Sequence, residues 1–295
     1  MNRLLRKLYY RGELLRRYGA QILMYWREHS GSALRVSSHF SLCSEFPKKS
    51  NVDFHVIIPA RYQSTRLPGK LLLDLGGSTV IERVYQQVLK AKPKSIIIAT
   101  DNLEIAEHAE GFGAQVKMTA ASHQTGTDRI AEVVAQGQFN AGDIIVNVQG
   151  DEPLIAPELI TQVAQSLHNS QNPIATLCWP VEHYEQLHNP NIVKVVRDCH
   201  NNALYFSRSP IPSHRDEPAS IAQVYRHIGL YAYRAAFLLD YVSWPVCELE
   251  TCEALEQLRV LWAGYKIRVD EACRKPLQDI NTQDDLVLAR QLLTF

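Results

Sequence analysis

Three cationic side chains lie close together in the stretch PARYQSTRLPGK. Arg61, Arg66 and Lys70 follow directly after the apolar run FHVII at 54–58, which has the composition of a buried strand. Like charges repel, so we expect an anion to compensate them, either a carboxylate of the chain or a ligand. The loop does not match the P-loop pattern, because Leu71 follows Lys70 and the first glycine is missing. Side-chain cations would therefore have to help hold phosphates, Arg as a planar fork and Lys as a point charge.

A carboxylate follows the end of another apolar run. In NVQGDEP, Asn147 and Gln149 are polar residues inside an otherwise apolar strand, and Asp151 comes just after it. Beside a triphosphate, such a carboxylate is a natural ligand for Mg²⁺, which binds one or two protein carboxylates together with phosphate oxygens. The alternative is that Asp151 caps a turn or pairs with Arg61.

The stretch HQTGTDR, residues 123–129, is rich in small hydrogen-bond donors and leads into a helix. Taken alone it predicts only a helix N-cap, at Thr127 or Asp128.

The stretch ETCEALEQLR begins at Glu250. Glu250, Glu253, Ala254 and Gln257 stand at i, i+3, i+4 and i+7, so one helical face would combine two acids and an amide around a small residue. A solvated face is the ordinary explanation of such a pattern.

Strand-like and helix-like segments alternate from residue 53 onward and would position these groups. The predicted strands are 54–58, 95–100, 144–149, 174–178, 192–196 and 228–233, and the predicted helices are 81–91, 102–112, 128–137, 157–168, 249–263 and 283–293. The alternation in the first half implies an α/β fold with a mostly parallel sheet covered on both faces. Ligands bind such sheets at the carboxyl ends of the strands, where the cationic loop and Asp151 lie. The segment 180–225 breaks the alternation and predicts an inserted subdomain.

The charge of the chain is unevenly distributed. The 295 residues carry no formal net charge, so bulk electrostatics favour neither a nucleic acid nor an anionic membrane as partner. Residues 1–52, however, hold 10 Lys and Arg against 3 Asp and Glu, which leaves 21 against 28 for residues 53–295. The basic segment 1–52 has three interpretations: a transit peptide, an amphipathic helix on a membrane surface, or an appendage outside the fold. We favour the third and expect no stable membrane association.

Seven segments in order along the chain resemble the 3-deoxy-manno-octulosonate (Kdo) cytidylyltransferases, also called CMP-Kdo synthetases. They are IIPARYQSTRLPGK, ATD (99–101), HQTGTDR, VNVQGDEP, ALYFSRSPIP (203–212), YRHIGLYAYR (225–234) and LETCEALEQLRVLWAGYKI (249–267). The resemblance spans 54–293. It implies a three-layer, Rossmann-like nucleotidyltransferase fold over 53–295, with a mixed, mostly parallel sheet. It also implies a small inserted subdomain, roughly 180–245, for dimerisation and sugar binding.

The resemblance implies that CTP and Kdo react to give CMP-Kdo and pyrophosphate, with Mg²⁺ as cofactor, for lipopolysaccharide biosynthesis. The catalytic residues it implies are Arg61, Arg66, Lys70 and Asp151. The residues implied to bind the nucleotide are Pro59, Ala60, Arg61, Lys70, Gly126, Thr127, Arg129 and Gln149. Those implied on the sugar side are Arg208, His227, Tyr231, Glu250 and Gln257. An Arg suits the sugar's carboxylate, whereas Glu and Gln suit its hydroxyls.

The chain departs from the family's C-terminal metal-binding motif, which resembles G-[VI]-D-T-x-x-D-L. The corresponding segment here reads DINTQDDL, which places Asn281 where the motif has Asp. Asn281 could coordinate through its carbonyl oxygen, Asp279 could substitute, or the sugar's own carboxylate could supply the ligand. We expect the first, with Asp151 and Asn281 as metal ligands and a weakened affinity for Mg²⁺, because an amide oxygen carries no charge.

The resemblance also implies a homodimer and a bacterial cytoplasmic location, although the family's plant members are organellar. A cytidylyltransferase for a related acid sugar is the nearest alternative. A catalytically inactive nucleotide-binding protein is the alternative from another class, and Asn281 is the one feature of the sequence that favours it.

Overall fold

The apolar run at the start of the compact unit forms a strand that is buried on both faces. In the computed structural model, which describes residues 52–62, 67–137, 139–216, 220–277 and 279–293, this is β1 (His55–Ala60). Successive side chains of a strand point to opposite faces of the sheet, so Val56 and Ile58 enter one core cluster and Ile57 the other. Arg66 and all of the basic segment except Val52 lie outside the described residues.

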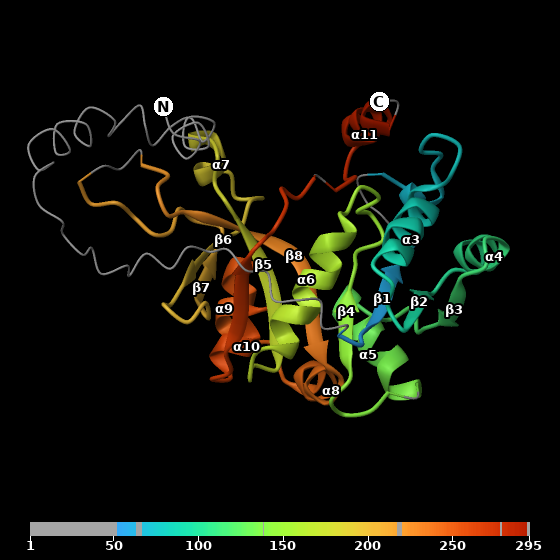
Figure 1. The fold of residues 1–295 in the computed structure, drawn as a ribbon, viewed down its shortest axis with the longest axis horizontal. Helices are drawn as coiled ribbons and strands as arrows, with labels where there is room; N and C mark the ends of the chain where they lie inside the picture. Colours follow the sequence, from blue (N-terminus) through green and yellow to red (C-terminus); the bar gives the residue numbers. More distant parts are fainter. Residues whose placement is uncertain (1–51, 63–66, 138, 217–219, 278, 294–295) are drawn as a thin grey trace, which may run out of the picture. The chain divides into compact units, whose positions relative to one another are not determined.

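Nine strands of the described chain form one sheet (Figure 1), seven of them in the order β3-β2-β1-β4-β8-β5-β9. The further strands are β2 (Ser95–Thr100), β3 (Gln115–Met118), β4 (Ile144–Asn147), β5 (Ile174–Pro180), β6 (Lys194–Arg197), β7 (Ala203–Ser207), β8 (Tyr225–Arg234) and β9 (Ile267–Glu271). In that order β8 runs antiparallel to both of its neighbours, and the other pairings are parallel. The predicted mixed, mostly parallel sheet is confirmed.

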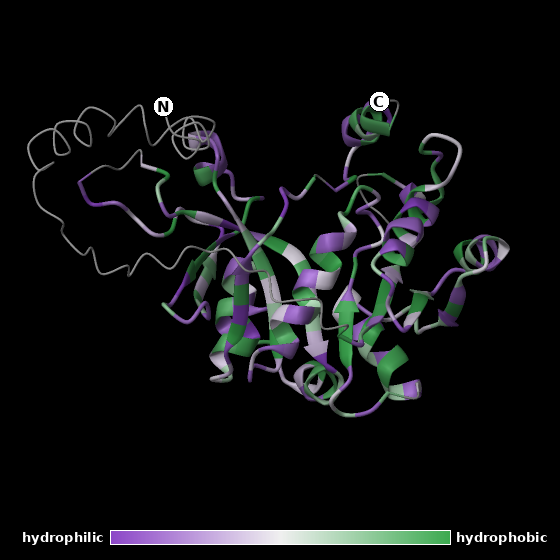
Figure 2. Ribbon diagram, viewed as in Figure 1, coloured by the Kyte–Doolittle hydropathy of each residue, from purple (hydrophilic) through white to green (hydrophobic). Residues whose placement is uncertain are grey.

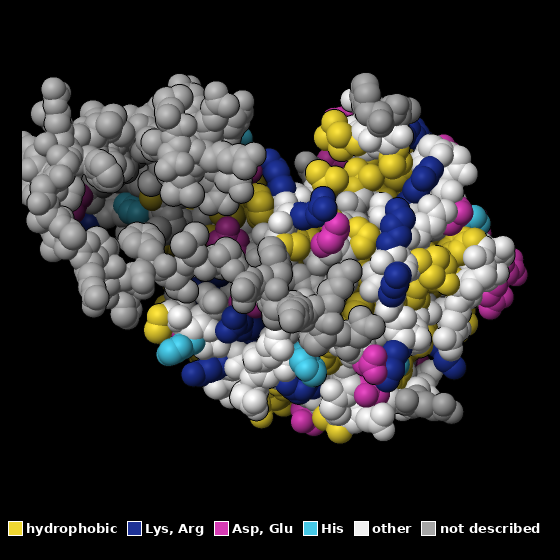
Figure 3. Space-filling model, in the orientation of Figure 1, with side chains coloured by type: hydrophobic (Ala, Val, Ile, Leu, Met, Phe, Trp, Pro, Cys, Tyr) yellow, Lys and Arg dark blue, Asp and Glu magenta, His cyan; other side chains and the backbone are white. Residues whose placement is uncertain are grey.

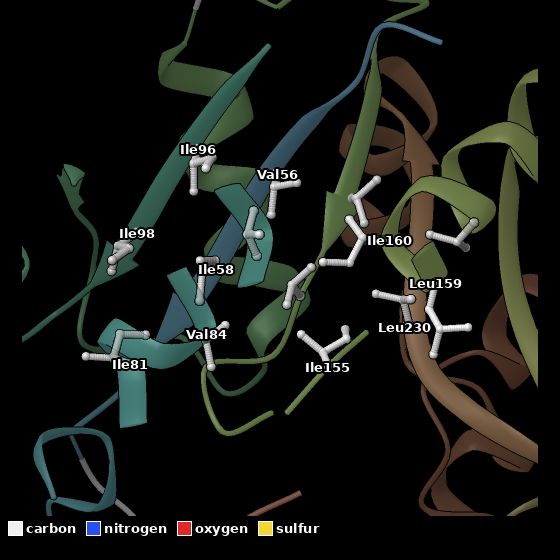
Figure 4. Packing of buried hydrophobic residues seen from close by; sticks show 14 of the residues in the cluster. Val56, Ile58, Ile81, Val84, Ile96, Ile98, Ile155, Leu159, Ile160 and Leu230 are labelled. Carbon is white, nitrogen blue, oxygen red and sulfur yellow. The ribbon is translucent and has the colours of Figure 1, made fainter. Parts of the chain in front are cut away.

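Helices cover both faces of the sheet and complete three layers. They are η1 (Lys70–Leu72), α3 (Val80–Lys90), α4 (Leu103–Gly111), α5 (Gly126–Gln136), α6 (Pro157–His168), α7 (Tyr184–His188), α8 (Ala235–Ser243), α9 (Glu248–Glu253), α10 (Leu258–Trp262) and α11 (Gln283–Leu293). Residues of α3, α4, α6 and α11 belong to the core cluster on one face, and residues of α5, α8 and α10 to the cluster on the other. Figure 4 shows side chains of α3 beside Ile58 of β1, and Leu159 and Ile160 of α6 beside Leu230 of β8, in the first cluster.

Hydrophobic residues run along the central strands, whereas helices alternate between hydrophilic and hydrophobic residues (Figure 2). On the face drawn in Figure 3, Lys and Arg side chains are interspersed with acidic and hydrophobic ones. Within the described residues, each helix is too short or too polar to cross a membrane.

Three strands were missed from the sequence, because β3, β7 and β9 are short and lack a long apolar run. In β9 a usable signal was present: Ile267 and Val269 are fully buried, whereas Arg268 and Asp270 pair with each other at 2.6 Å. This alternation is typical of a strand. The helix α8 was also missed, because it begins at Ala235, directly after β8 ends at Arg234, and no turn residue separates the two elements.

The predicted helix 249–263 is wrong, because the chain breaks it into α9 and α10. Ala254 adopts the left-handed conformation, with φ of 49° and ψ of 52°, at the end of α9. The guanidinium of Arg208 donates to the carbonyls of Glu253 and Ala254 at 2.6 and 3.1 Å, so these carbonyls are satisfied without a continuing helix. Tertiary contacts therefore override the helical period of this segment.

The second half of the predicted inserted subdomain also needs correction. Strand β8 lies inside the sheet, where Val146 pairs with Ala232 and Ala175 pairs with the same residue from the other side. Strands β6 and β7 extend from β8 rather than forming a sheet of their own. The residues from Tyr225 onward thus belong to the central layer, which the reversed direction of β8 hides from a search for βαβ alternation.

Candidate active site

The carboxyl ends of β1 and β4 bring the cationic loop and the acidic turn together. The two strands are parallel neighbours, with Ile57 beside Asn147. Lys70 Nζ, at the end of the cationic loop, makes a close salt bridge with the Asp151 carboxylate and donates to the Ile280 carbonyl at 3.1 Å. The Ile280 N–H in turn donates to the Asp151 carbonyl at 2.9 Å. The alternative that Asp151 pairs with Arg61 is wrong.

A first cavity of about 260 Å³ opens at this edge of the sheet. The predicted residues that line it are Pro59, Arg61, Lys70, Gly126, Arg129, Gln149, Asp151 and Asn281. Of the other predicted nucleotide contacts, Thr127 lines a neighbouring cavity, and Ala60 is fully buried in the core.

Arg61 differs from the other cations of this cavity. It is exposed and forms no ion pair with the acidic residues that the structure describes. Arg129, by contrast, is 3% exposed and donates to the carboxylate of Asp101 at 2.8 Å. Arg61 therefore presents a charge to the cavity that the described part of the protein does not neutralise, whereas Arg129 anchors the start of α5.

Two glycines let the backbones around the first cavity approach each other closely. A Cβ at Gly150 would lie 3.0 Å from the Pro59 carbonyl oxygen and 3.5 Å from Leu71 Cδ1. A Cβ at Gly126 would lie 3.3 Å from Pro59 Cγ. The loop after β1, the turn after β4 and the start of α5 are thus packed so tightly that a Cβ at either position would require its neighbours to shift.

A second cavity, of about 250 Å³, adjoins the first. Gln149 and Glu256 line both cavities, so they stand at the junction. Tyr231 and Gln257, both predicted on the sugar side, line the second cavity. The Tyr231 hydroxyl is buried and has no hydrogen-bond partner among the described residues, an arrangement that favours a ligand partner.

Three predicted sugar-side residues line neither cavity. The Arg208 guanidinium is bonded to backbone carbonyls, as described above. Burial lowers the pKa of His227 to about 3, so its imidazole is neutral, and its Nε2 lies 3.1 Å from Thr176 Oγ1. The carboxylate of Glu250 accepts two bonds from Arg259, at 2.5 and 2.6 Å, in a buried ion pair.

Glu256 is the residue that sequence reasoning missed. The assumption of one continuous helix placed Glu250 and Gln257 on a shared face, but the break at Ala254 turns Glu256 toward the cavities instead. Burial raises the pKa of its carboxyl, and a hydrogen bond from the Thr127 side chain opposes that rise. Its position beside Gln257 in LEQLR was the available signal.

Two further carboxyl groups, those of Glu152 and Asp279, lie close to Asp151 beside the first cavity. Burial raises the pKa values of Glu152 and Asp279. The charges of Asp279 and Asp151 raise the pKa of Glu152 further, and the charge of Asp151 raises that of Asp279. No group of three or more His, Cys, Asp and Glu side chains is arranged as a metal site within the described ranges. Asp151 and Asn281, however, both line the first cavity, so one carboxylate and one amide face the same space. Such oxygen donors fit a hard cation that takes its other ligands from phosphate or water.

Comparison with known proteins decides the family. A family model described as cytidylyltransferase matches residues 55–267. A 3-deoxy-manno-octulosonate cytidylyltransferase of Legionella pneumophila (strain Corby) is 65% identical over 239 residues, which are 81% of this chain and 96% of the relative. The chain belongs to the 3-deoxy-manno-octulosonate cytidylyltransferase family. A further member, from Francisella philomiragia, is 50% identical over 246 residues, 82% of this chain and 98% of its own length.

Solved structures agree with this cytidylyltransferase assignment. A CMP:2-keto-3-deoxy-manno-octonic acid synthetase complexed with CTP superposes with a TM-score of 0.77 at 38% identity, covering 82% of this chain and 98% of its own. A 4-diphosphocytidyl-2C-methyl-D-erythritol synthase from Anaerococcus prevotii, at 15% identity and a TM-score of 0.56, shares the fold. The predicted nucleotidyltransferase fold and the family resemblance are both confirmed.

The close approach at Gly150 gives a test of the site's geometry. We expect Gly150→Ala to displace the turn that carries Asp151, because the added methyl meets the backbone oxygen of Pro59 rather than a flexible side chain. Cytidylyltransferase activity should fall by a factor of about 100, since misplaced reacting groups are costly even at 1 Å. Steady-state rates for the purified variant, with folding checked by circular dichroism, measure this.

The matched control is Gly142→Ala, where an added Cβ meets no atom within 4 Å. It should retain the wild-type rate. An active Gly150→Ala variant would contradict the packing described here.

Proposed function

We propose that the chain transfers CMP from CTP to Kdo and releases pyrophosphate. The observation that carries this proposal is the pair of adjoining cavities, one with cationic groups and one with hydroxyl and amide groups, that share Gln149 and Glu256. Two substrates bound side by side can react at such a junction. The relatives' name and the CTP complex of a similar enzyme support the same assignment of substrates.

The first cavity would hold the triphosphate of CTP. Arg61 supplies a guanidinium without an ion-pair partner in the described chain, and Lys70 can exchange its Asp151 contact for phosphate oxygens. The start of α5 adds backbone N–H groups around Gly126, which favour an anion at a helix N-terminus. These cations stabilise the charge that develops on the departing pyrophosphate.

The second cavity would hold Kdo. The Tyr231 hydroxyl and the Gln257 amide can bond the sugar's hydroxyls, and Glu256 and Gln149 orient the attacking hydroxyl at the junction. The new bond joins the sugar oxygen to the α-phosphorus, and the bond from that phosphorus to the bridging oxygen of pyrophosphate breaks. Catalysis would come chiefly from positioning and charge neutralisation.

Asp151 and Asn281 would hold Mg²⁺ at the edge of the first cavity. When bound there, Mg²⁺ would supply positive charge that offsets the charge of the phosphates. The protein residues hold the acidic turn in place, through the Ile280 and Lys70 contacts to Asp151. The homodimer and the cytoplasmic location stay predictions.

A turnover assay tests the function. Purified protein with CTP, Mg²⁺ and Kdo should release pyrophosphate and form CMP-Kdo, whereas a panel of related 2-keto acid sugars should react more slowly. A faster rate with another acid sugar would identify that sugar, rather than Kdo, as the substrate. No pyrophosphate at saturating Mg²⁺ would favour the inactive nucleotide-binding protein.

Removing the unpaired cation should weaken the use of CTP. We expect Arg61→Ala to lower kcat/KM for CTP by about 100-fold, since a charge-assisted contact to the triphosphate is lost at the transition state. Arg61→Lys should give an intermediate kcat/KM for CTP, because lysine keeps the positive charge but lacks the planar guanidinium. Arg215→Ala, which removes a guanidinium that is 91% exposed, is the control and should match wild type. Unchanged CTP kinetics in Arg61→Ala would refute the placement of the triphosphate.

A carboxylate at position 281 should strengthen the binding of Mg²⁺. We expect Asn281→Asp to lower the Mg²⁺ concentration for half-maximal rate by roughly tenfold, a typical size for altered metal surroundings. Without Mg²⁺ the added charge near Asp279 should lower the melting temperature, and Mg²⁺ should restore it. Asn191→Asp, on the exposed loop before β6, is the control. An unchanged or higher Mg²⁺ requirement would count against Asn281 as a ligand.

A further inference from the structure

The segment from Ala254 to Gln257 is a wall of the second cavity. All four of its residues line that cavity, and Glu256 also lines the first. The segment has no regular structure of its own, since it lies between the end of α9 and the start of α10. Whatever fixes this segment therefore fixes the groups that would face the sugar.

Arg208 and Glu253 hold the segment through reciprocal contacts, which we name the Arg208–Glu253 clasp. The Arg208 guanidinium donates to the carbonyls of Glu253, Ala254 and Pro190 at 2.6, 3.1 and 2.8 Å. The Glu253 carboxylate accepts from the Arg208 backbone N–H at 2.9 Å and from the Ser207 hydroxyl at 2.6 Å. Each side chain thus binds the backbone of the other residue, and the wall is tied to the end of β7.

A buried lysine anchors the β7 side of the clasp. Lys194 is fully buried, and its ammonium donates to three backbone carbonyls, those of Arg208, Ile192 and Asn189, at 2.6, 2.6 and 3.1 Å. A charged group this deep is retained only where its hydrogen bonds are satisfied. The carbonyl of Arg208 is therefore fixed from inside the protein, and the clasp has a rigid base.

We infer that Glu253 is a positioning residue for the sugar site, acting through the Arg208–Glu253 clasp on the wall that carries Glu256 and Gln257. This inference rests on the proposed function. Glu253 lines neither cavity, so it acts on the sugar only through its neighbours. Three of the four wall residues line the second cavity alone. Loosening the wall should therefore weaken the binding of the sugar more than the binding of CTP.

A series of substitutions at Glu253 separates geometry from charge. In Glu253→Gln the amide oxygen can accept from the Arg208 N–H, and the amide NH₂ can donate to the Ser207 hydroxyl, which is able to accept. In Glu253→Asp the charge remains but the side chain is one methylene too short to keep both contacts. We expect Glu253→Gln to have the wild-type KM for Kdo. Glu253→Asp and Glu253→Ala should each raise the KM for Kdo by about tenfold, a size typical of losing hydrogen bonds to a buried backbone.

The readouts distinguish positioning from simple stability. KM for Kdo and KM for CTP are measured for each variant together with the melting temperature, and Glu248→Ala, at an exposed acid of the same helix, is the control. A rise in KM for Kdo without a rise in KM for CTP, in Glu253→Asp and Glu253→Ala, supports the inference. The inference is overturned if Glu253→Gln is as impaired as Glu253→Ala, if both KM values shift equally, or if only the melting temperature changes.

The failure of this inference is distinct from failure of the proposed function. If wild-type protein makes CMP-Kdo and Glu253→Asp does so with an unaltered KM for Kdo, the role of Glu253 is wrong and the function stands. If the wild-type protein releases no pyrophosphate from CTP and Kdo, the function itself fails.

Discussion

The salt bridge between Lys70 and Asp151 is the contact on which the first cavity depends. It joins residues 81 apart in the sequence, and the bond from Lys70 to Ile280 spans 210. Lys70 and Asp151 meet because β1 and β4 are parallel neighbours with their carboxyl ends at one edge. The pair also sets the electrostatics, because Lys70 neutralises the carboxylate that a cation would bind. In the proposed complex, a triphosphate and its metal would give both groups new partners, so that neither charge would be left uncompensated.

The junction of the two cavities follows from the reversed strand. Because β8 runs against β4, it places Tyr231 beside Asn147, and Asn147 and Gln149 then face the same space as the Tyr231 ring. The wall from Ala254 to Gln257 closes this space from the other side. It is held by the Arg208–Glu253 clasp and by the Tyr241 hydroxyl, which donates to the Glu256 carbonyl at 2.9 Å. The strand that breaks the parallel pattern is therefore the one that makes room for a second substrate.

The sequence predicts the elements that have a strong local signal. Continuous apolar runs located β1, β2, β4 and β5, and the position of polar residues at their ends located the edge where Arg61, Lys70 and Asp151 meet. Local patterns could not predict the break at Ala254, because Arg208, 46 residues away, supplies the donors that satisfy the end of α9. Because of the same break, Glu256 rather than the predicted Glu250 lines the cavities. Arg259 pairs with Glu250 from nine residues away, a partner visible only once the helix is known to bend.

The uncharged side chain of Asn281 and the positive charge of Lys70 both limit the negative charge around Asp151. Burial raises the pKa values of Glu152 and Asp279, and the charges of neighbouring carboxylates raise them further. Another carboxylate would add to this repulsion, which Lys70 offsets only in part at Asp279. Asp285 is occupied elsewhere, since it accepts the backbone N–H groups of Asn281 and Thr282 at 3.0 and 2.8 Å at the start of α11. An amide places an oxygen at the cavity without the added charge. It lowers the repulsion between the acidic groups and, for the same reason, would weaken the attraction of the proposed Mg²⁺.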